Sequence, residues 1–213
     1  MTAANGKITA TFWDCGGVLL TNGWDHVARK CVIEHFGLDF DEFEQRHAEQ
    51  NDPWERGKIS LQQYLDATVF YVPRQFTMEQ FVSLMQVVSQ VLYPAMIDFL
   101  RQLRQPCTPG NRILAYLLSN ESRELMAYRI PKFGLGPLFD AFLVSAYIGL
   151  RKPEPAFFTR ALEISQRRPE QCVFIDDREE NVAAAQKLGI HSIRLESPQQ
   201  GIAELGKLGI LAA

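Results

Sequence analysis

The side chains of this chain that could do chemistry stand in four short polar stretches. These stretches are Asp14, Ser119-Asn120, Lys152 and Asp176-Asp177. Three of them follow apolar runs of the kind that form buried strands, and Lys152 precedes a proline. Carboxylates, a lysine and small hydrogen-bonding side chains are suited to binding a hard cation and an anion together. The four stretches therefore predict a polar site for charged ligands.

Asp14 ends the apolar run TATFW and precedes Gly16-Gly17. A strand holds such an acid rigidly, and the glycines allow a ligand to approach the backbone closely. We therefore interpret Asp14 as a nucleophile and a metal ligand, and the backbone carbonyl of Gly16 as a further ligand. Strand alternation directs Cys15 away from Asp14, so Cys15 is expected to be a buried packing residue.

Asp14, Asp176 and Asp177 would place three carboxylates at one edge of a sheet. Their mutual repulsion either raises their pKa values or requires a cation. A set of oxygen ligands without histidine or cysteine favours a hard cation, most simply Mg²⁺.

Ser119, Asn120 and Lys152 could bind the anion beside that metal. Ser119 and Asn120 can donate hydrogen bonds, and the helix that follows them offers backbone N–H groups. Lys152 is a point charge that can hold a phosphate and a nucleophile together. With a carboxylate nucleophile and Mg²⁺, this set fits phosphoryl transfer through an aspartyl-phosphate.

The elements that position these residues alternate between strands and helices in the second half of the chain. Strands are expected near 8–13, 112–118, 139–145, 172–175 and 191–195. A helix that starts at Pro153 should follow the third strand. This alternation predicts an α/β fold, a Rossmann-like doubly wound parallel sheet core. The polar stretches lie at the carboxyl ends of the strands, where ligands bind in such sheets.

The first two strands are separated by far more than the dozen or so residues that a crossover needs. The helical periodicity in this gap predicts helices near 24–36, 39–50, 61–72 and 78–92, with a break at Asn51-Asp52-Pro53. We expect an inserted all-helical cap at 23–92 and a core domain formed by 1–22 and 93–213. A cap over the site would exclude water from it.

Composition excludes several classes of function. The chain is 46% hydrophobic and 22% charged, as in ordinary globular proteins, and its net charge of −3 without a basic block argues against nucleic acid as a partner. It has no run of 18 apolar residues, so no membrane span is expected, and its first residues do not resemble a secretion signal. We expect a cytoplasmic protein, and an apolar cap face could pair with a second copy as a homodimer.

Four motifs of the chain, in their order, resemble those of the haloacid-dehalogenase-like (HAD) hydrolases. They are Asp14 with Gly17-Val18-Leu19, Leu118-Ser119-Asn120, Lys152-Pro153 and Phe174-Ile175-Asp176-Asp177. Further stretches are similar to the branch that contains bacterial glucose-1-phosphate phosphatases and the phosphatase domain of soluble epoxide hydrolases. These stretches are Glu55–Ser60, Arg151–Glu154 and Gly16.

The resemblance implies roles for these residues. Asp14 would be the nucleophile and a metal ligand, Ser119 and Lys152 would bind the phosphoryl group, and Asp176 and Asp177 would hold Mg²⁺. Most phosphatases of the family carry a second Asp two residues after the nucleophile, as general acid and base.

This chain has Gly16 at the position of that second Asp. We therefore hypothesise a substrate with a good leaving group, such as a sugar 1-phosphate or an acyl phosphate. A second hypothesis is that Asp25 or His26 supplies the proton.

The function expected from the sequence is a Mg²⁺-dependent phosphatase of a small phosphorylated metabolite. One alternative is a 2-haloacid dehalogenase, which would use the same nucleophile without a metal; the paired Asp176-Asp177 argues against it. The other alternative is a catalytically weak protein that binds a phospho-ligand for regulation. This alternative follows from Gly16, which stands at the position of the second Asp.

Overall fold

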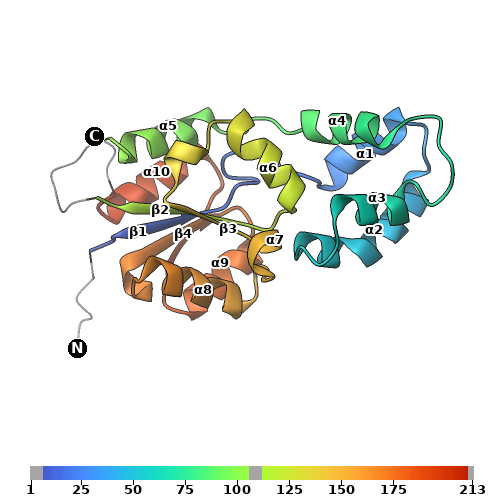
Figure 1. The fold of residues 1–213 in the computed structure, drawn as a ribbon. Coiled ribbons are helices and arrows are strands. Elements are labelled where there is room, and N and C mark those ends of the chain that lie inside the picture. Colours follow the sequence, from blue (N-terminus) through green and yellow to red (C-terminus); the bar gives the residue numbers. More distant parts are fainter. Residues whose placement is uncertain (1–6, 106–111, 211–213) are drawn as a thin grey trace.

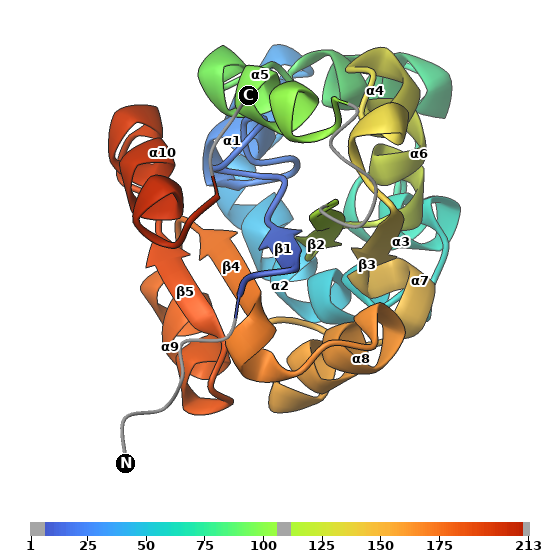
Figure 2. The ribbon, with the colours of Figure 1, turned by 90° about the vertical axis from the view of Figure 1, so that its left-hand side faces the viewer.

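The computed structural model describes residues 7–105 and 112–210, and these residues form one five-stranded sheet. All strand pairs in it are parallel, in the order β3-β2-β1-β4-β5, which Figure 2 shows nearly end-on. The strands are β1 (Ala10–Trp13), β2 (Leu114–Ser119), β3 (Ala141–Val144), β4 (Cys172–Asp176) and β5 (His191–Arg194). This order confirms the predicted doubly wound α/β core.

The direction of winding reverses at β1, which lies between β2 and β4. Trp13 at the end of β1 pairs with Leu117 of β2 and with Ile175 of β4. The residues that follow these three positions therefore come together at one edge of the sheet. In doubly wound sheets, ligands bind at this switch point.

Helices cover both faces of the sheet (Figure 1). On one face lie α5 (Pro94–Leu103), α6 (Arg123–Lys132) and α10 (Pro198–Lys207), and on the other lie α8 (Pro155–Ser165) and α9 (Glu179–Lys187). Three short elements complete this domain: η1 (Gly136–Leu138), α7 (Ser145–Ile148) and η2 (Pro169–Gln171). The described helices are all too short or too polar to span a lipid bilayer.

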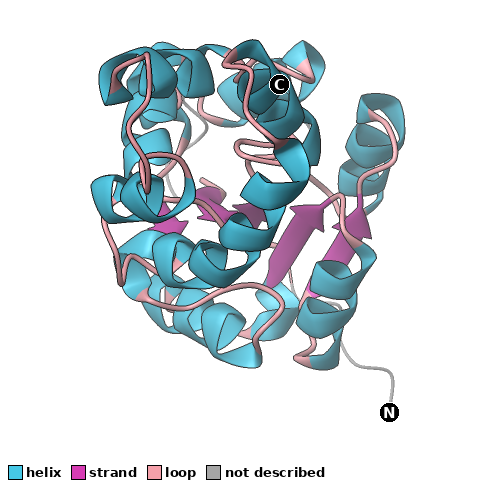
Figure 3. Ribbon diagram, turned by 90° about the vertical axis from the view of Figure 1, so that its right-hand side faces the viewer, coloured by secondary structure: helices cyan, strands magenta, loops and turns pink. Residues whose placement is uncertain are grey.

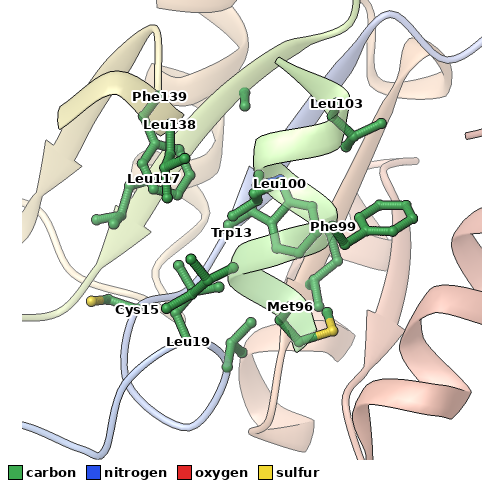
Figure 4. Close-up of a cluster of buried hydrophobic side chains, with 14 of the residues drawn as sticks. Trp13, Cys15, Leu19, Met96, Phe99, Leu100, Leu103, Leu117, Leu138 and Phe139 are labelled. Carbon is green, nitrogen blue, oxygen red and sulfur yellow. The ribbon is translucent and has the colours of Figure 1, made fainter. Parts of the chain in front are cut away.

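Both faces of the strands are buried, which explains their nearly continuous apolar sequences. Trp13 points to the α5 side, where its ring lies 6.4 Å from that of Phe99, whereas Phe12 belongs to the cluster on the α8 side. Cys15 is fully buried in the hydrophobic cluster on the α5 side of the sheet (Figure 4), so its predicted role in packing is confirmed.

A separate group of helices between β1 and β2 forms the predicted cap. It contains α1 (His26–His35), α2 (Phe40–Glu55), α3 (Leu61–Thr68) and α4 (Met78–Val87). The cap has its own aromatic core, in which Trp54 stacks on Tyr64 with ring centroids 4.2 Å apart. The cap helices lie beyond the carboxyl edge of the sheet (Figure 1) and stand in front of part of it when the molecule is viewed from the cap side (Figure 3).

The two segments that join the cap to the core lie side by side. The backbone N–H of Thr21 donates to the carbonyl of Gln90 at 2.9 Å, and the N–H of Leu92 donates to the carbonyl of Leu19 at 3.0 Å. We therefore propose that the cap extends over 23–92, with its boundaries at these paired segments.

The predicted break at Asn51-Asp52-Pro53 is wrong, because α2 continues through Pro53 to Glu55. A proline inside a helix removes one hydrogen bond at a cost of about 3 kcal/mol. The burial of Trp54 next to it offsets this cost, since Trp54 is 1% exposed within the cap core.

Other element boundaries also differ from those predicted. Helix α8, predicted to begin at Pro153, begins at Pro155, and Ser145, predicted as the end of a strand, begins α7. Helices α3 and α4 end at Thr68 and Val87, earlier than their apolar periodicity indicates.

Candidate active site

Asp14 follows β1 directly and is buried, with 8% of its surface exposed. Its backbone N–H donates to the carbonyl of Ile175 at 2.9 Å, which fixes Asp14 against β4. Oδ1 of its carboxylate accepts a hydrogen bond from the N–H of Cys15 at 2.7 Å. The apolar strand therefore holds the carboxylate in one orientation at the switch point of the sheet.

Lys152 lies between two carboxylates. Its Nζ is 2.8 Å from Oδ1 of Asp14 and donates to Oδ2 of Asp176 at 2.7 Å. Burial disfavours the charged ammonium, but the two carboxylates outweigh burial and raise the pKa of Lys152. Lys152 is therefore held as a cation against the predicted nucleophile.

Asn120 fixes the backbone of Lys152 from both sides. Its Nδ2 donates to the carbonyl of Lys152 at 2.8 Å, and its Oδ1 accepts from the N–H of Lys152 at 2.9 Å. The side chain that the sequence assigns to substrate binding thus also aligns the loop that carries the lysine.

The three predicted carboxylates come together. One oxygen each of Asp14, Asp176 and Asp177 lies within 4.8 Å of the other two. Burial raises the pKa of Asp14 to about 7, Lys152 opposes this shift, and Asp176 and Asp177 add to it. Burial and the neighbouring Asp176 also raise the pKa of Asp177. One lysine does not compensate three acids, so the cluster can hold a cation.

Asp177 has a carboxylate oxygen that such a cation could bind. Its Oδ1 is buried, and no group of the described residues forms a hydrogen bond with it. A buried carboxylate oxygen without a partner is costly, and a hard cation satisfies it.

Asp176 is completely buried and is held by Asn181, a residue that the sequence reasoning missed. Nδ2 of Asn181 lies 3.0 and 3.1 Å from the two carboxylate oxygens, and the N–H of Arg178 donates to Oδ1 at 2.9 Å. Asn181 lies on α9, five residues after Asp176. This spacing does not indicate a contact between the two side chains until the position of the helix is known.

A cavity with about 70 Å³ of free space opens at this edge of the sheet. Asp14, Gly16, Ser119, Asn120 and Lys152 line it, so these predicted site residues share one cavity. The rest of its wall also consists of charged and amide side chains together with glycine, and its charged members include Glu55, Glu121, Arg129, Arg151 and Arg178.

The cap contributes Glu55 to the cavity wall through the end of α2. Oε2 of Glu55 lies 2.6 Å from Nη2 of Arg151, which belongs to the core. Arg151 also pairs with Asp52 at 3.0 Å, and Arg56 of the cap pairs in turn with Glu154 of the core. These reciprocal ion pairs hold the cap over the site.

A second buried ion pair stands at the back of the wall. Nη1 of Arg129 donates to Oε2 of Glu121 at 2.9 Å, and Oε1 of Glu121 accepts from the N–H of Ser122 at 2.9 Å. Burial raises the pKa of Glu121 to about 7, although Arg129 opposes the shift. The sequence reasoning did not identify this pair.

The structure does not support Asp25 or His26 as the proton donor, since neither belongs to the described wall of the cavity. The side chain of Asp25 caps α1 by accepting from the N–H of Ala28 at 2.8 Å. The side chain of His26 is 65% exposed and lies 3.5 Å from Glu44.

Comparisons with known proteins find one matching family model and several distant relatives. The family model of haloacid dehalogenase-like hydrolases matches residues 8–189. The sesquiterpene phosphatase astK of Aspergillus oryzae is 26% identical over 211 residues, which are 93% of this chain and 95% of that protein. The bifunctional epoxide hydrolase 2 of Rattus norvegicus is 27% identical over 93 residues, 44% of this chain and 16% of that protein.

Two further findings limit what these similarities show about the chain. The chain spans about a fifth of the length of the first curated relatives that it matches. Among solved structures, a predicted HAD-like hydrolase from Porphyromonas gingivalis has a TM-score of 0.76 at 22% identity, over 95% of this chain and 98% of that chain. This likeness shows a shared fold.

Proposed function

The chain belongs to the haloacid dehalogenase-like hydrolase family, and we propose that it is a Mg²⁺-dependent phosphatase. Its substrate would be a small phosphorylated metabolite, such as a sugar 1-phosphate, hydrolysed through an aspartyl-phosphate on Asp14. One observation carries the proposal: Lys152 bridges the two buried carboxylates of a cluster of three, Asp14 and Asp176, and Asp177 is half-buried beside them. The proposed nucleophile and the phosphate-binding lysine then line one cavity, and the nucleophile is also a member of the carboxylate cluster.

The residues present fit Mg²⁺. Asp14, Asp176 and Asp177 offer oxygen ligands, the unpartnered Oδ1 of Asp177 among them, and the carbonyl of Gly16 is a further candidate. When bound, Mg²⁺ neutralises charge on the phosphoryl oxygens and orients the phosphoryl group.

Attack is assigned to Oδ2 of Asp14, because Oδ1 is already held by Lys152 and the N–H of Cys15. The bond from Oδ2 to phosphorus forms while the bond from phosphorus to the leaving oxygen breaks. Water then attacks phosphorus, the bond to Oδ2 breaks, and the proton of the water passes to the released phosphate or to solvent. The carboxylate of Asp14 is thereby restored.

Ser119 and Lys152 bind phosphoryl oxygens in this proposal, since both line the cavity with Asp14. Asn120 holds the backbone of Lys152 and presents the rest of its side chain to the cavity. Positioning of this kind can supply much of a rate enhancement, because misplacement by about 1 Å can cost about 10²-fold.

The wall of the cavity favours a small polar substrate. Its described members include no aromatic or aliphatic side chain beyond glycine. A terpenoid chain, of the kind that the name of the Aspergillus relative indicates, would find little apolar surface in this cavity.

Of the two alternatives, a metal-free 2-haloacid dehalogenase is less well supported. Such an enzyme has no need for a third carboxylate beside its nucleophile, and the buried Oδ1 of Asp177 would stay without a partner. A weak regulatory protein would bind phosphate at the same residues, so only turnover distinguishes it from an enzyme.

The test is phosphate release from a panel of phosphorylated metabolites, with Mg²⁺ and with EDTA, beside the variant Asp14→Asn. We expect release that requires both Mg²⁺ and Asp14. Absence of release from every compound by a folded protein would favour the regulatory alternative. Release of halide from 2-haloacids in EDTA would instead favour the dehalogenase.

A further inference from the structure

Gly16 leaves a gap in the site that another residue fills. A Cβ built on Gly16 would lie 2.6 Å from Oδ1 and 3.3 Å from Cα of Asn22. The shorter distance is close to the separation between the Cβ and the carboxylate oxygens within an aspartate. The side-chain oxygen of Asn22 therefore occupies space that a side chain at position 16 would enter, and its carboxamide lines the cavity with Gly16 and Asp14.

The segment that carries Asn22 is fixed on both sides. The carbonyl of Thr21 accepts from Nη2 of Arg129, and its N–H donates to the carbonyl of Gln90 at 2.9 Å. Any Cβ on Gly23 would overlap the carboxylate of Glu121, so the backbone here packs tightly against the Glu121–Arg129 pair. This packing holds Asn22 at the wall of the cavity.

Outside the Asp14–Asp176–Asp177 cluster, Glu55 and Glu121 are the carboxyl groups of the described wall. Each contacts an arginine, Arg151 at 2.6 Å and Arg129 at 2.9 Å respectively. A guanidinium partner favours the ionised carboxylate, which has no proton to donate. Burial nevertheless raises the pKa of both carboxyl groups, that of Glu121 to about 7, so Glu121 is the main rival proton donor.

We propose that Asn22 donates a hydrogen bond from its side-chain amide to the leaving oxygen of the substrate, and that the described wall supplies no proton to that oxygen. The inference rests on the proposed phosphatase function and narrows its substrates. An amide stabilises an oxygen by hydrogen bonding but releases no proton near neutral pH. Asn22 is thus a determinant of leaving-group specificity.

The first step needs no proton donor. Oδ2 of Asp14 forms its bond to phosphorus, the bond to the leaving oxygen breaks, and the electron pair stays on that oxygen. The leaving group departs as an anion and takes its proton from water afterwards. Suitable substrates are therefore acyl, enol and anomeric phosphates, whose anions are stable, whereas simple alkyl phosphates are poor substrates.

The first test measures kcat/KM of the wild-type enzyme with Mg²⁺ for 4-nitrophenyl, phenyl and ethyl phosphate, in order of rising leaving-group pKa. General acid catalysis contributes typically about 10²–10⁴ in rate. We therefore expect kcat/KM for ethyl phosphate to lie at least about 10²-fold below that for 4-nitrophenyl phosphate. Similar values across the three esters would overturn the inference.

The second test uses two variants of Asn22 with nearly unchanged shape. Asn22→Asp supplies a carboxyl group at the same place, so the ratio of ethyl to 4-nitrophenyl phosphate activity should rise by about tenfold or more. Asn22→Leu removes the hydrogen bond and should lower activity on ethyl phosphate more than on 4-nitrophenyl phosphate, because the negative charge on the leaving oxygen is more localised in the alkyl ester. An unchanged ratio in Asn22→Asp would show that Asn22 does not face the leaving oxygen.

The variant Glu121→Gln tests the rival explanation, in which Glu121 donates a proton to the leaving oxygen. If the wild-type dependence on the leaving group is shallow and becomes steep in Glu121→Gln, Glu121 is the proton donor and the inference is wrong. Failure of the proposed function has a different signature, because no Asp14-dependent release would then occur even from 4-nitrophenyl phosphate.

Discussion

The ammonium of Lys152 lies 2.8 Å from Oδ1 of Asp14, and both side chains are buried at the switch point of the sheet. The same ammonium donates to Asp176 at 2.7 Å. Attraction between these charges is strong where water is excluded. One ammonium nevertheless faces three carboxylates, so the cluster keeps a negative charge that a divalent cation can compensate.

Replacing Lys152 by methionine should remove activity and stability together. Loss of a preorganised cation at a reacting group typically costs at least about 10² in rate, and breaking a buried ion pair costs about 3–5 kcal/mol. Phosphate release and urea unfolding would measure the two effects. Lys132→Met, at the exposed end of α6, is the control. Activity of Lys152→Met within about tenfold of wild type would rule out the assigned role.

Mg²⁺ should stabilise the protein through Asp177. A ligand that binds only the folded state adds about 2.7 kcal/mol at a hundredfold excess over Kd. We expect Mg²⁺ to raise the melting temperature of EDTA-treated wild type and to have a much smaller effect on Asp177→Asn. Asp66→Asn, exposed on α3, should respond like wild type. An equal shift in Asp177→Asn would place the cation elsewhere.

His47 should make the cap sensitive to mild acid. Burial lowers the pKa of His47 from 6.5 to about 4, and its Nδ1 lies 2.8 Å from the hydroxyl of Tyr64. Trp24 donates to the same hydroxyl oxygen at 2.8 Å, so the ring of His47 belongs to a buried network of hydrogen bonds. The unfolded chain takes up its proton near pH 6.5 and the folded protein only near pH 4.

Stability should therefore fall as the pH drops through this window, by up to about 3 kcal/mol. His47→Gln, which can still accept the hydrogen bond, should lack this loss in urea unfolding between pH 7 and about pH 4. His35→Gln, at the exposed end of α1, should keep it. Identical pH profiles for wild type and His47→Gln would contradict the prediction.

Gly57 should be needed for the close approach of the cap to the core. It has a φ of +67°, and a Cβ on it would overlap the carbonyl oxygen of Ala146 in α7. Gly37 has a similar φ of +64° but open space around it, so Gly37→Ala is a matched control for backbone strain. The backbone strain should cost each alanine variant about 1–2 kcal/mol of stability, and the overlap with Ala146 should add to the cost in Gly57→Ala.

Gly57→Ala should in addition displace the end of α2 from the cavity and lower kcat/KM, by as much as about 10²-fold. Gly37→Ala should leave kcat/KM near that of wild type. Equal kcat/KM values in the two variants would show that the contact with Ala146 has no part in activity.

Much of the fold and the meeting of the three acids could be predicted from strand ends. Asp14 and Asp176 are far apart in the sequence, but each terminates or follows a buried parallel strand, and such strands end at a common edge. The helical cap could be predicted because the apolar residues between β1 and β2 repeat with helical period.

Contacts made by a second layer of residues could not be predicted in this way. Asn181 holds Asp176, Asn120 holds the backbone of Lys152, and Arg151 reaches Glu55 across the boundary between core and cap. These side chains are ordinary polar residues in the sequence, and local spacing does not encode which of them meet. Likewise, propensity predicted a break at Pro53, and the packing of Trp54 in the cap core overrides it.

The sequence by itself determined the architecture and the chemical type of the site, because hydrophobic period and the residues at strand ends are local properties. Only the tertiary structure decided which side chains surround the predicted site residues. It placed Asn22 against Gly16, joined Arg129 to Glu121, and left Oδ1 of Asp177 without a hydrogen bond from any residue of 7–105 and 112–210. These outcomes depend on the distances between distant segments, which the packing of cap on core sets.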